Sequence, residues 1–325
     1  MTLGIITGLI AALCQSLCYL ATRYYVQKRA AGASRQLLVL GHLWMGVFSL
    51  IVLPFVWHGG VADIVPLLSA LVCAALFYLV GQFALLIALK HTEPSRVSPL
   101  LGFKIIVLAV MASFMVQPHV AGTPDPVVGL TAMQWVGVVL CCVAAVALNF
   151  SGGRLRRRAI AAIVFACVVY SLSDWNIAIL VSGVQNMIER RLSLSCSGGV
   201  AHVRAAFLAP FCATALTYLF TGLIAAGFFP ASGARDKTAW RDAVPWAAAW
   251  FLAMIFLYMC FGLIGPVLGN ILQSSRGVMS ILIGSLLVYR GHLHIEPFHG
   301  RRVFVRRLAA GVLMFAAVIL YAVGK

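Results

Sequence analysis

The sequence predicts an all-α polytopic membrane protein whose ten transmembrane helices form two inverted five-helix repeats. Three observations lead to this fold class: the composition, the spacing of apolar runs and an internal repeat. The 325-residue chain is 62% hydrophobic and only 10% charged, with a mean hydropathy of +1.01. A soluble domain is typically about half apolar and a quarter charged. The chain therefore needs lipid as its solvent, which excludes the soluble globular classes.

Ten apolar runs follow one another along the chain, and each approaches the ~20 residues with which a helix crosses a bilayer. The first run has no basic segment before it and no cleavage site, so we expect it to be retained as a span. Eight of the nine cysteines lie in these runs and are expected to be small core residues rather than disulfide partners. The runs cover residues 3–22, 37–57, 64–89, 97–116, 131–150, 159–181, 206–228, 245–264, 270–288 and 308–323.

A basic linker at 151–158 divides the chain into a first repeat, 1–150, and a second, 159–325. Each half holds five spans, and because five is odd the halves enter the membrane in opposite orientations. Residues 93–116 align with 265–288 at an offset of 172, which pairs Lys104 with Arg276. Two weaker matches keep the same order along the chain: 15–17 aligns with 170–172, and 135–139 with 309–313.

The net charge of +16 comes from basic residues spread among the loops, which favours contact with anionic lipid over nucleic acid. The odd-numbered loops hold 18 Lys and Arg residues and the even-numbered loops hold three. The positive-inside rule then places the odd loops in the cytoplasm and both termini outside. We expect the protein in the inner (plasma) membrane, with the lipid bilayer as its surroundings.

The two five-helix halves, the proline-flanked segment 93–100 before the fourth span and the glycine-led fifth span resemble the drug/metabolite transporter superfamily, of the EamA type. The resemblance covers essentially the whole chain. It implies a ten-helix carrier whose central cavity is lined mainly by spans 1, 3, 4, 6, 8 and 9, with peripheral fifth and tenth spans. It also implies cytoplasmic termini, contrary to the charge count, so the orientation stays open.

Two cations, Lys104 and Arg276, lie inside apolar spans, where a charge costs at least a few kcal/mol and usually faces a cavity or a partner. Asp174 is the one acid well inside a span, and counting from the loops puts it level with Arg276. We therefore expect Asp174 to pair with Arg276, and Tyr19 to lie near Lys104. Because no acidic partner is expected for Lys104 within the membrane, Lys104 is predicted to bind a carboxylate or phosphate of the substrate. The alternative is that both cations snorkel or bind backbone carbonyls.

Polar residues four apart share a helix face, and three such pairs are predicted to line the cavity. The alternative for each pair is hydrogen bonding between helices. The histidines of the ninth loop, at 292, 294 and 299, are expected to be solvated, so neither a metal nor a cofactor is predicted. The predicted substrate-binding residues are the pairs Gln15 and Tyr19, Tyr78 and Gln82, and Tyr170 and Asp174, together with Lys104, Gln273 and Arg276.

The predicted function is secondary transport of a small metabolite or drug by alternating access, and the two cations make an anionic substrate one option. Proton exchange through Asp174, electroneutral exchange and facilitated flow stay open, as do the direction of transport and the choice between monomer and homodimer. Two alternatives come from other classes: an integral-membrane enzyme acting on lipid headgroups, and a non-transporting scaffold or sensor. No catalytic residue is predicted.

Overall fold

The computed structural model describes residues 1–29, 32–91, 100–115, 129–149, 157–194, 198–233, 236–279, 282–283 and 301–324. These residues form helices, and no β-strand occurs among them. The main elements are α1 (Thr2–Lys28), α2 (Ala33–Val56), η1 (Val61–Leu67), α3 (Leu68–His91), η2 (Leu101–Phe103), α5 (Lys104–Phe114), α6 (Ala132–Asn149), α7 (Arg157–Leu192), α8 (Gly198–Ser232), α9 (Lys237–Ile264), α10 (Pro266–Ser274) and α12 (Arg301–Val323).

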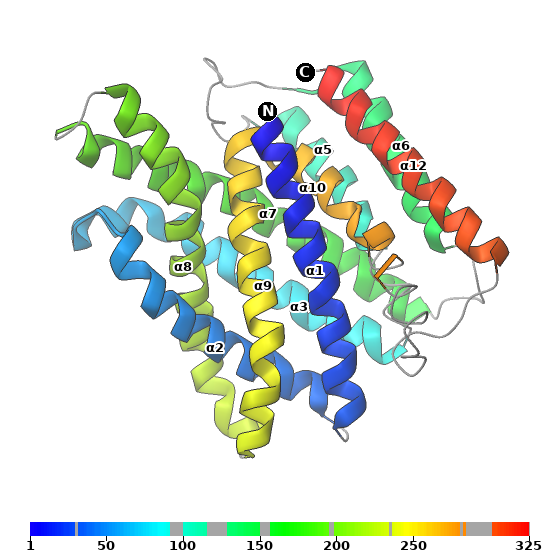
Figure 1. Ribbon diagram of the computed structural model, residues 1–325, viewed down its shortest axis with the longest axis horizontal. Coiled ribbons are helices and arrows are strands. Elements are labelled where there is room, and N and C mark those ends of the chain that lie inside the picture. Colours follow the sequence, from blue (N-terminus) through cyan, green and yellow to red (C-terminus); the bar gives the residue numbers. More distant parts are fainter. Residues whose placement is uncertain are drawn as a thin grey trace.

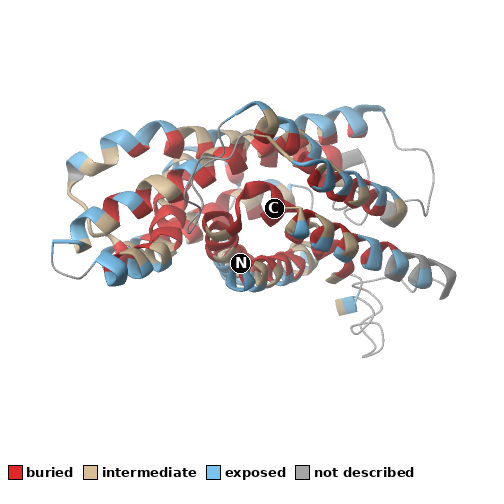
Figure 2. Cartoon of the chain, turned by 90° about the horizontal axis from the view of Figure 1, so that it is seen from above, coloured by how far each residue is buried: buried red, intermediate tan, exposed pale blue. Residues whose placement is uncertain are grey.

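The protein is a multi-pass membrane protein. Within the described ranges, six helices are long and apolar enough to cross a bilayer. Large apolar side chains also lie on the outside; Phe55 is 78% exposed and Phe114 is 84% exposed. Figure 2 shows buried residues on the facing sides of the helices and exposed ones on the outward sides. An outer surface of this kind is stable in hydrocarbon, where helices satisfy their own backbone hydrogen bonds.

The centre of the molecule is formed by α1, α3, α7 and α9, together with the shorter α5 and α10 (Figure 1). Helix α1 packs along α9, and α3 packs along α7. Helices α2 and α8 pair on one side of this centre, and α6 and α12 pair on the other (Figure 1). The two termini lie at the same end of the molecule (Figure 1).

Two glycines set the distance between α2 and α8. A Cβ atom on Gly222 would lie 2.9 Å from the Cα atom of Gly46 and 3.1 Å from the carbonyl oxygen of His42. Small residues at a crossing allow helix backbones to approach closely, which is the common way to gain van der Waals contact in a membrane. A side chain at Gly222 would therefore clash with α2, and one at Gly46 would be tight against α8, with its Cβ 3.3 Å from the Cα atom of Gly222.

The fourth and ninth spans are broken, whereas the sequence predicts continuous runs at 97–116 and 270–288. The 3-10 turn η2 ends where α5 begins, at Lys104. Helix α10 ends at a turn in which the Ser275 amide donates to the carbonyl of Leu272, and Arg276 follows directly. Breaks of this kind interrupt the hydrogen-bond ladder of the helix and leave carbonyl groups to be satisfied from elsewhere. Most of the linker (151–156), the ninth-loop histidines and residues 284–300 lie outside the described residues.

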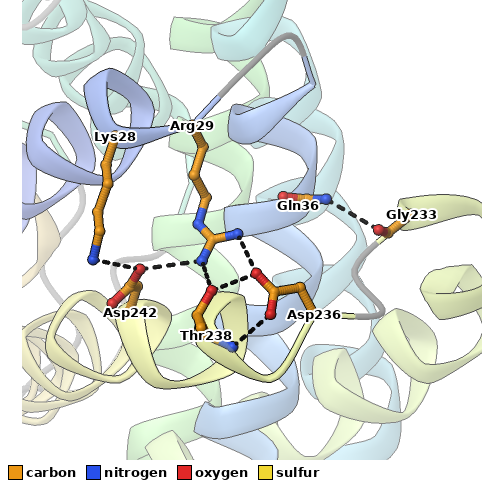
Figure 3. A network of polar contacts seen from close by, with 7 residues as sticks. All are labelled: Lys28, Arg29, Gln36, Gly233, Asp236, Thr238 and Asp242. Carbon is orange, nitrogen blue, oxygen red and sulfur yellow. Dashed lines mark hydrogen bonds and ion pairs between the residues drawn. The ribbon is translucent and has the colours of Figure 1, made fainter.

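Ion pairs tie α1 to the start of α9. Arg29 contacts both Asp236 and Asp242, at 3.3 and 3.1 Å, and Lys28 lies 3.0 Å from the same Asp242 (Figure 3). A smaller contact ties the end of α7 to η1, where Arg191 lies 2.7 Å from Asp63. In each case the basic C-terminal end of one helix meets acids at the start of another, which is the favourable arrangement for both helix dipoles.

Candidate functional site

A cavity lies between the central helices. The space open to the centre of a water molecule is about 40 Å³, room for roughly three waters at ~10–15 Å³ each. Its wall combines charged, polar and aromatic side chains. The lining residues are Gln15, Tyr19, Tyr78, Leu85, Leu101, Lys104, Tyr170, Asp174, Ile177, Tyr218, Trp250, Met254, Leu257, Tyr258, Gln273 and Arg276.

Eight of the nine residues predicted from the sequence line this one cavity. The exception is Gln82, which is buried on α3 one turn beyond Tyr78 and is not part of the wall. Its Nε2 atom has no hydrogen-bond partner among the described residues. Although Gln82 is four residues from Tyr78 on the same helix, it does not line the cavity.

Lys104 is neutralised by an ion pair. Its Nζ atom lies 2.9 Å from the Oδ2 atom of Asp174, and each side chain is only 8% exposed. The same Nζ atom lies 6.0 Å from the ring centre of Tyr170, within cation–π range. A buried pair of this geometry offsets much of the cost of removing both charges from water.

Arg276 has neutral partners. Its Nη1 atom donates to the Oε1 atom of Gln15 at 3.1 Å, and its guanidinium carbon lies 5.7 Å from the ring centre of Tyr19. Among the described residues, no carboxylate lies within ion-pair distance of this guanidinium, and its Nε atom has no hydrogen-bond partner. The neighbouring Gln273 also lines the cavity, with its Oε1 atom unpartnered there. Arg276 is therefore a buried cation with unused donor capacity.

The predicted partners of the two cations are thus exchanged. The sequence placed Asp174 with Arg276 and Tyr19 with Lys104, but Asp174 contacts Lys104 and Tyr19 contacts Arg276. The prediction that Lys104 lacks a deep acidic partner is wrong for the same reason. Depth counted from the loops gives a height along a helix but does not say which helix lies opposite. Helix α5 packs on α7, and α10 packs on α1.

Two serines contact the backbone directly after the helix breaks. The Ser171 hydroxyl lies 2.9 Å from the carbonyl oxygen of Lys104, and the Ser16 hydroxyl lies 3.0 Å from that of Arg276. Each hydroxyl also lies within hydrogen-bond distance of a carbonyl one turn back in its own helix. Each serine thus contacts, from a neighbouring helix, the carbonyl group of the first residue after a break, and shares its single proton between that carbonyl and the one in its own helix.

Sequence reasoning missed an aromatic part of the wall, which comes from α8 and α9. Tyr218 and Trp250 are buried there, and the Trp250 indole N–H donates to the Tyr218 hydroxyl at 2.8 Å. Tyr258 lies on the same wall. Trp250 and Tyr258 have no polar neighbour four residues away, and Tyr218 has only Thr214, so their pattern is that of ordinary packing. The aromatic residues of the eighth span could have been found only through the cavity-lining role that the resemblance implies for that span.

The charges on the wall do not balance. Lys104 and Asp174 neutralise each other, which leaves the guanidinium of Arg276 in excess. Guanidinium groups bind carboxylates and phosphates through paired, charge-assisted hydrogen bonds. The arrangement can hold a small anion against Arg276, with aromatic faces around its apolar part.

No family model matches this sequence, and no curated protein matches it at a significant level. One solved structure, "Crystal structure of protein", is similar over 98% of this chain and 95% of that chain, with a TM-score of 0.59 and 16% sequence identity. A likeness at this identity concerns the fold alone. The chain thus shares the overall helix arrangement of that structure.

Proposed function

We propose that the protein is a secondary transporter of the inner membrane, of the EamA type in the drug/metabolite transporter superfamily. It carries a small organic anion between two faces of the bilayer by alternating access. The observation that carries this proposal is Arg276, a cation that is 5% exposed in the central cavity and has no acidic partner among the described residues. A charge kept in hydrocarbon without a counter-ion usually marks the path of a substrate or ion.

The proposed architecture is two inverted repeats of five spans, and the helix contacts support it. If spans 1 to 5 correspond to spans 6 to 10, the packing of α1 on α9 corresponds to that of α7 on α3. The packing of α10 on α1 corresponds likewise to that of α5 on α7, and α2–α8 and α6–α12 are pairs of equivalent spans. Repeats related in this way build a site near the midplane from interrupted helices.

The serine contacts follow the same correspondence. Ser16 and Ser171 align in the sequence repeat, and each contacts the carbonyl group of the cation in the other half. Tyr19 and Asp174 also align, and each contacts that same cation. In an inverted arrangement, the ion pairs at the ends of α1 and α7 lie on opposite faces of the bilayer. Opening them in turn would expose the cavity to one face at a time.

The test is flux in proteoliposomes that contain the purified full-length chain. Wild type should exchange a small aromatic or aliphatic carboxylate across the vesicle membrane. The Arg276→Gln variant should show at least about tenfold less flux than wild type, because one charge-assisted hydrogen bond contributes about 1.5–3 kcal/mol. Arg190→Gln is the matched control, since Arg190 lies at the exposed end of α7 and bonds the Asn186 carbonyl.

Equal flux in wild type and Arg276→Gln would contradict the anion site. Absence of flux for every carboxylate, phosphate and neutral metabolite tried would contradict transport itself. The remaining choices would then be an enzyme acting on lipid headgroups or a non-transporting scaffold.

A further inference from the structure

A buried histidine lies behind the aromatic wall of the cavity and has no role in the transport cycle proposed above. His42, on α2, is 1% exposed. Its Nδ1 atom lies 2.7 Å from the carbonyl oxygen of Leu38, and its Nε2 atom lies 3.2 Å from the hydroxyl of Tyr78. The rings of Tyr78, Tyr218 and Trp246 surround it, with centroids 5.5 to 6.3 Å away.

These contacts fix the tautomer of the imidazole. A carbonyl oxygen can only accept, so the hydrogen must sit on Nδ1. No described carboxylate pairs with His42, and burial without a counter-ion favours the neutral ring. A neutral imidazole carries one N–H group. Its Nε2 atom is therefore an acceptor, and the Tyr78 hydroxyl donates to it.

The single proton of the Tyr78 hydroxyl is used in the bond to His42, so this hydroxyl can only accept from any other group. The neighbouring Tyr218 hydroxyl accepts from the Trp250 indole at 2.8 Å. Tyr78 and Tyr218 both line the cavity.

The cavity wall consequently has two kinds of surface. Arg276 offers hydrogen-bond donors, and Tyr78 offers a lone pair but no proton. An anion that also carries an N–H or O–H group can use both. An anion with only a methyl group in that place would displace water from Tyr78 and leave a lone pair of its oxygen without a partner, which costs free energy.

We propose that His42 is a positioning residue that determines specificity: it holds Tyr78 as an acceptor, so that the cavity selects a small organic anion bearing a hydrogen-bond donor. This inference rests on the proposed function, because it takes Arg276 as the anion-binding group. It adds the second chemical feature of the substrate and a residue outside the cavity that sets it.

The experiment compares isosteric ligands of equal charge: 3- and 4-aminobenzoate against 3- and 4-methylbenzoate. Affinities are measured by calorimetry on the purified full-length protein in detergent. For at least one isomer, wild type should bind the amino compound about three- to tenfold more tightly than the methyl compound, as one net hydrogen bond allows. In His42→Phe that ratio should fall toward one, because the Tyr78 hydroxyl can then turn its proton to the cavity and no longer acts as an acceptor alone. Tyr78→Phe should lose the ratio too, because the acceptor itself is gone.

Trp246→Phe is the matched control, since it alters packing on the same imidazole and removes no hydrogen bond to it; it should keep the wild-type ratio. A His42→Phe variant that keeps the ratio, or that weakens both compounds equally, would overturn the inference. Equal binding of amino and methyl compounds by wild type would overturn it as well but leave the anion site standing. If neither wild type nor Arg276→Gln binds any of the four compounds, both this inference and the proposed anion site are contradicted.

Discussion

Lys104 and Arg276 align in the sequence at an offset of 172 residues, yet their surroundings differ in one decisive respect. Both follow a helix break, and both have their carbonyl group held by a serine of a neighbouring helix. Lys104 then meets a carboxylate, whereas Arg276 meets the neutral side chains of Gln15 and Tyr19. The serine contact is common to both, whereas the charge of the partner differs. The comparison suggests that one half keeps its cation for structure and the other offers its cation to a ligand.

The largest expected effect comes from removing the charge of Asp174, the residue that neutralises Lys104. Asp174→Asn leaves the Lys104 ammonium buried without its partner, and breaking a buried ion pair costs about 3–5 kcal/mol. Thermal unfolding in detergent should show a large loss of stability, well beyond that of Arg276→Gln. The double variant Lys104→Met with Asp174→Leu removes both charges and should recover most of the loss. If Asp174→Asn and Arg276→Gln unfold at the same temperature, the two cations are not differently compensated.

A smaller and symmetrical effect is expected from the serines. Ser16→Ala and Ser171→Ala each remove a hydrogen bond to the carbonyl group of a cation, which contributes about 0.5–1.5 kcal/mol to stability. The two losses should be equal within about 0.5 kcal/mol, because the contacts have the same geometry. Thr22→Ala is a control in which only a bond to the helix's own Cys18 carbonyl is lost. A marked loss in one serine variant alone would break the correspondence between the halves.

The smallest effect concerns the ends of the helices, where α1 has the larger set of ion pairs. Hydrogen bonds from Thr238, and then the Arg29 guanidinium, hold the pKa of the Asp236 carboxyl below its usual value of 3.8. A lowered pKa stabilises the folded state above 3.8, and this contribution is lost as the pH falls through the folded-state value. The unfolding temperature should therefore fall slightly between about pH 5 and pH 3. The fall should be smaller in Asp236→Asn; an identical profile in that variant would assign the decrease to other carboxyls.

The sequence could predict the class of fold and most of the cavity, because both follow from local rules. Apolar runs identify the membrane spans, and residues four apart lie on the same face of a helix. For this reason Gln15 and Tyr19 both line the cavity. The partner of each cation could not be predicted in this way. Which helix faces Lys104 depends on packing between segments 70 residues apart, and no local pattern encodes it.

Two other features of the site could not be predicted from the sequence, for related reasons. Tyr218 and Trp250 form part of the wall, but an aromatic residue in an apolar run has the same pattern whether it faces a cavity, a neighbouring helix or lipid. The breaks before Lys104 and Arg276 lie in apolar runs, where a residue such as Pro99 permits a kink but does not fix its position. At each break a serine of another helix contacts the residue that follows, as the Ser16 hydroxyl contacts the Arg276 carbonyl.

The serine contacts also have a consequence for biogenesis. Ser171 and Asp174 leave the ribosome 67 and 70 residues after Lys104, and Arg276 follows Ser16 by 260 residues. During synthesis Lys104 therefore lacks the Asp174 carboxylate and the Ser171 hydroxyl until the sixth span has been made. Each half supplies contacts that complete the other, so fragments cut at the linker should be more stable when they are made together than when either is made alone.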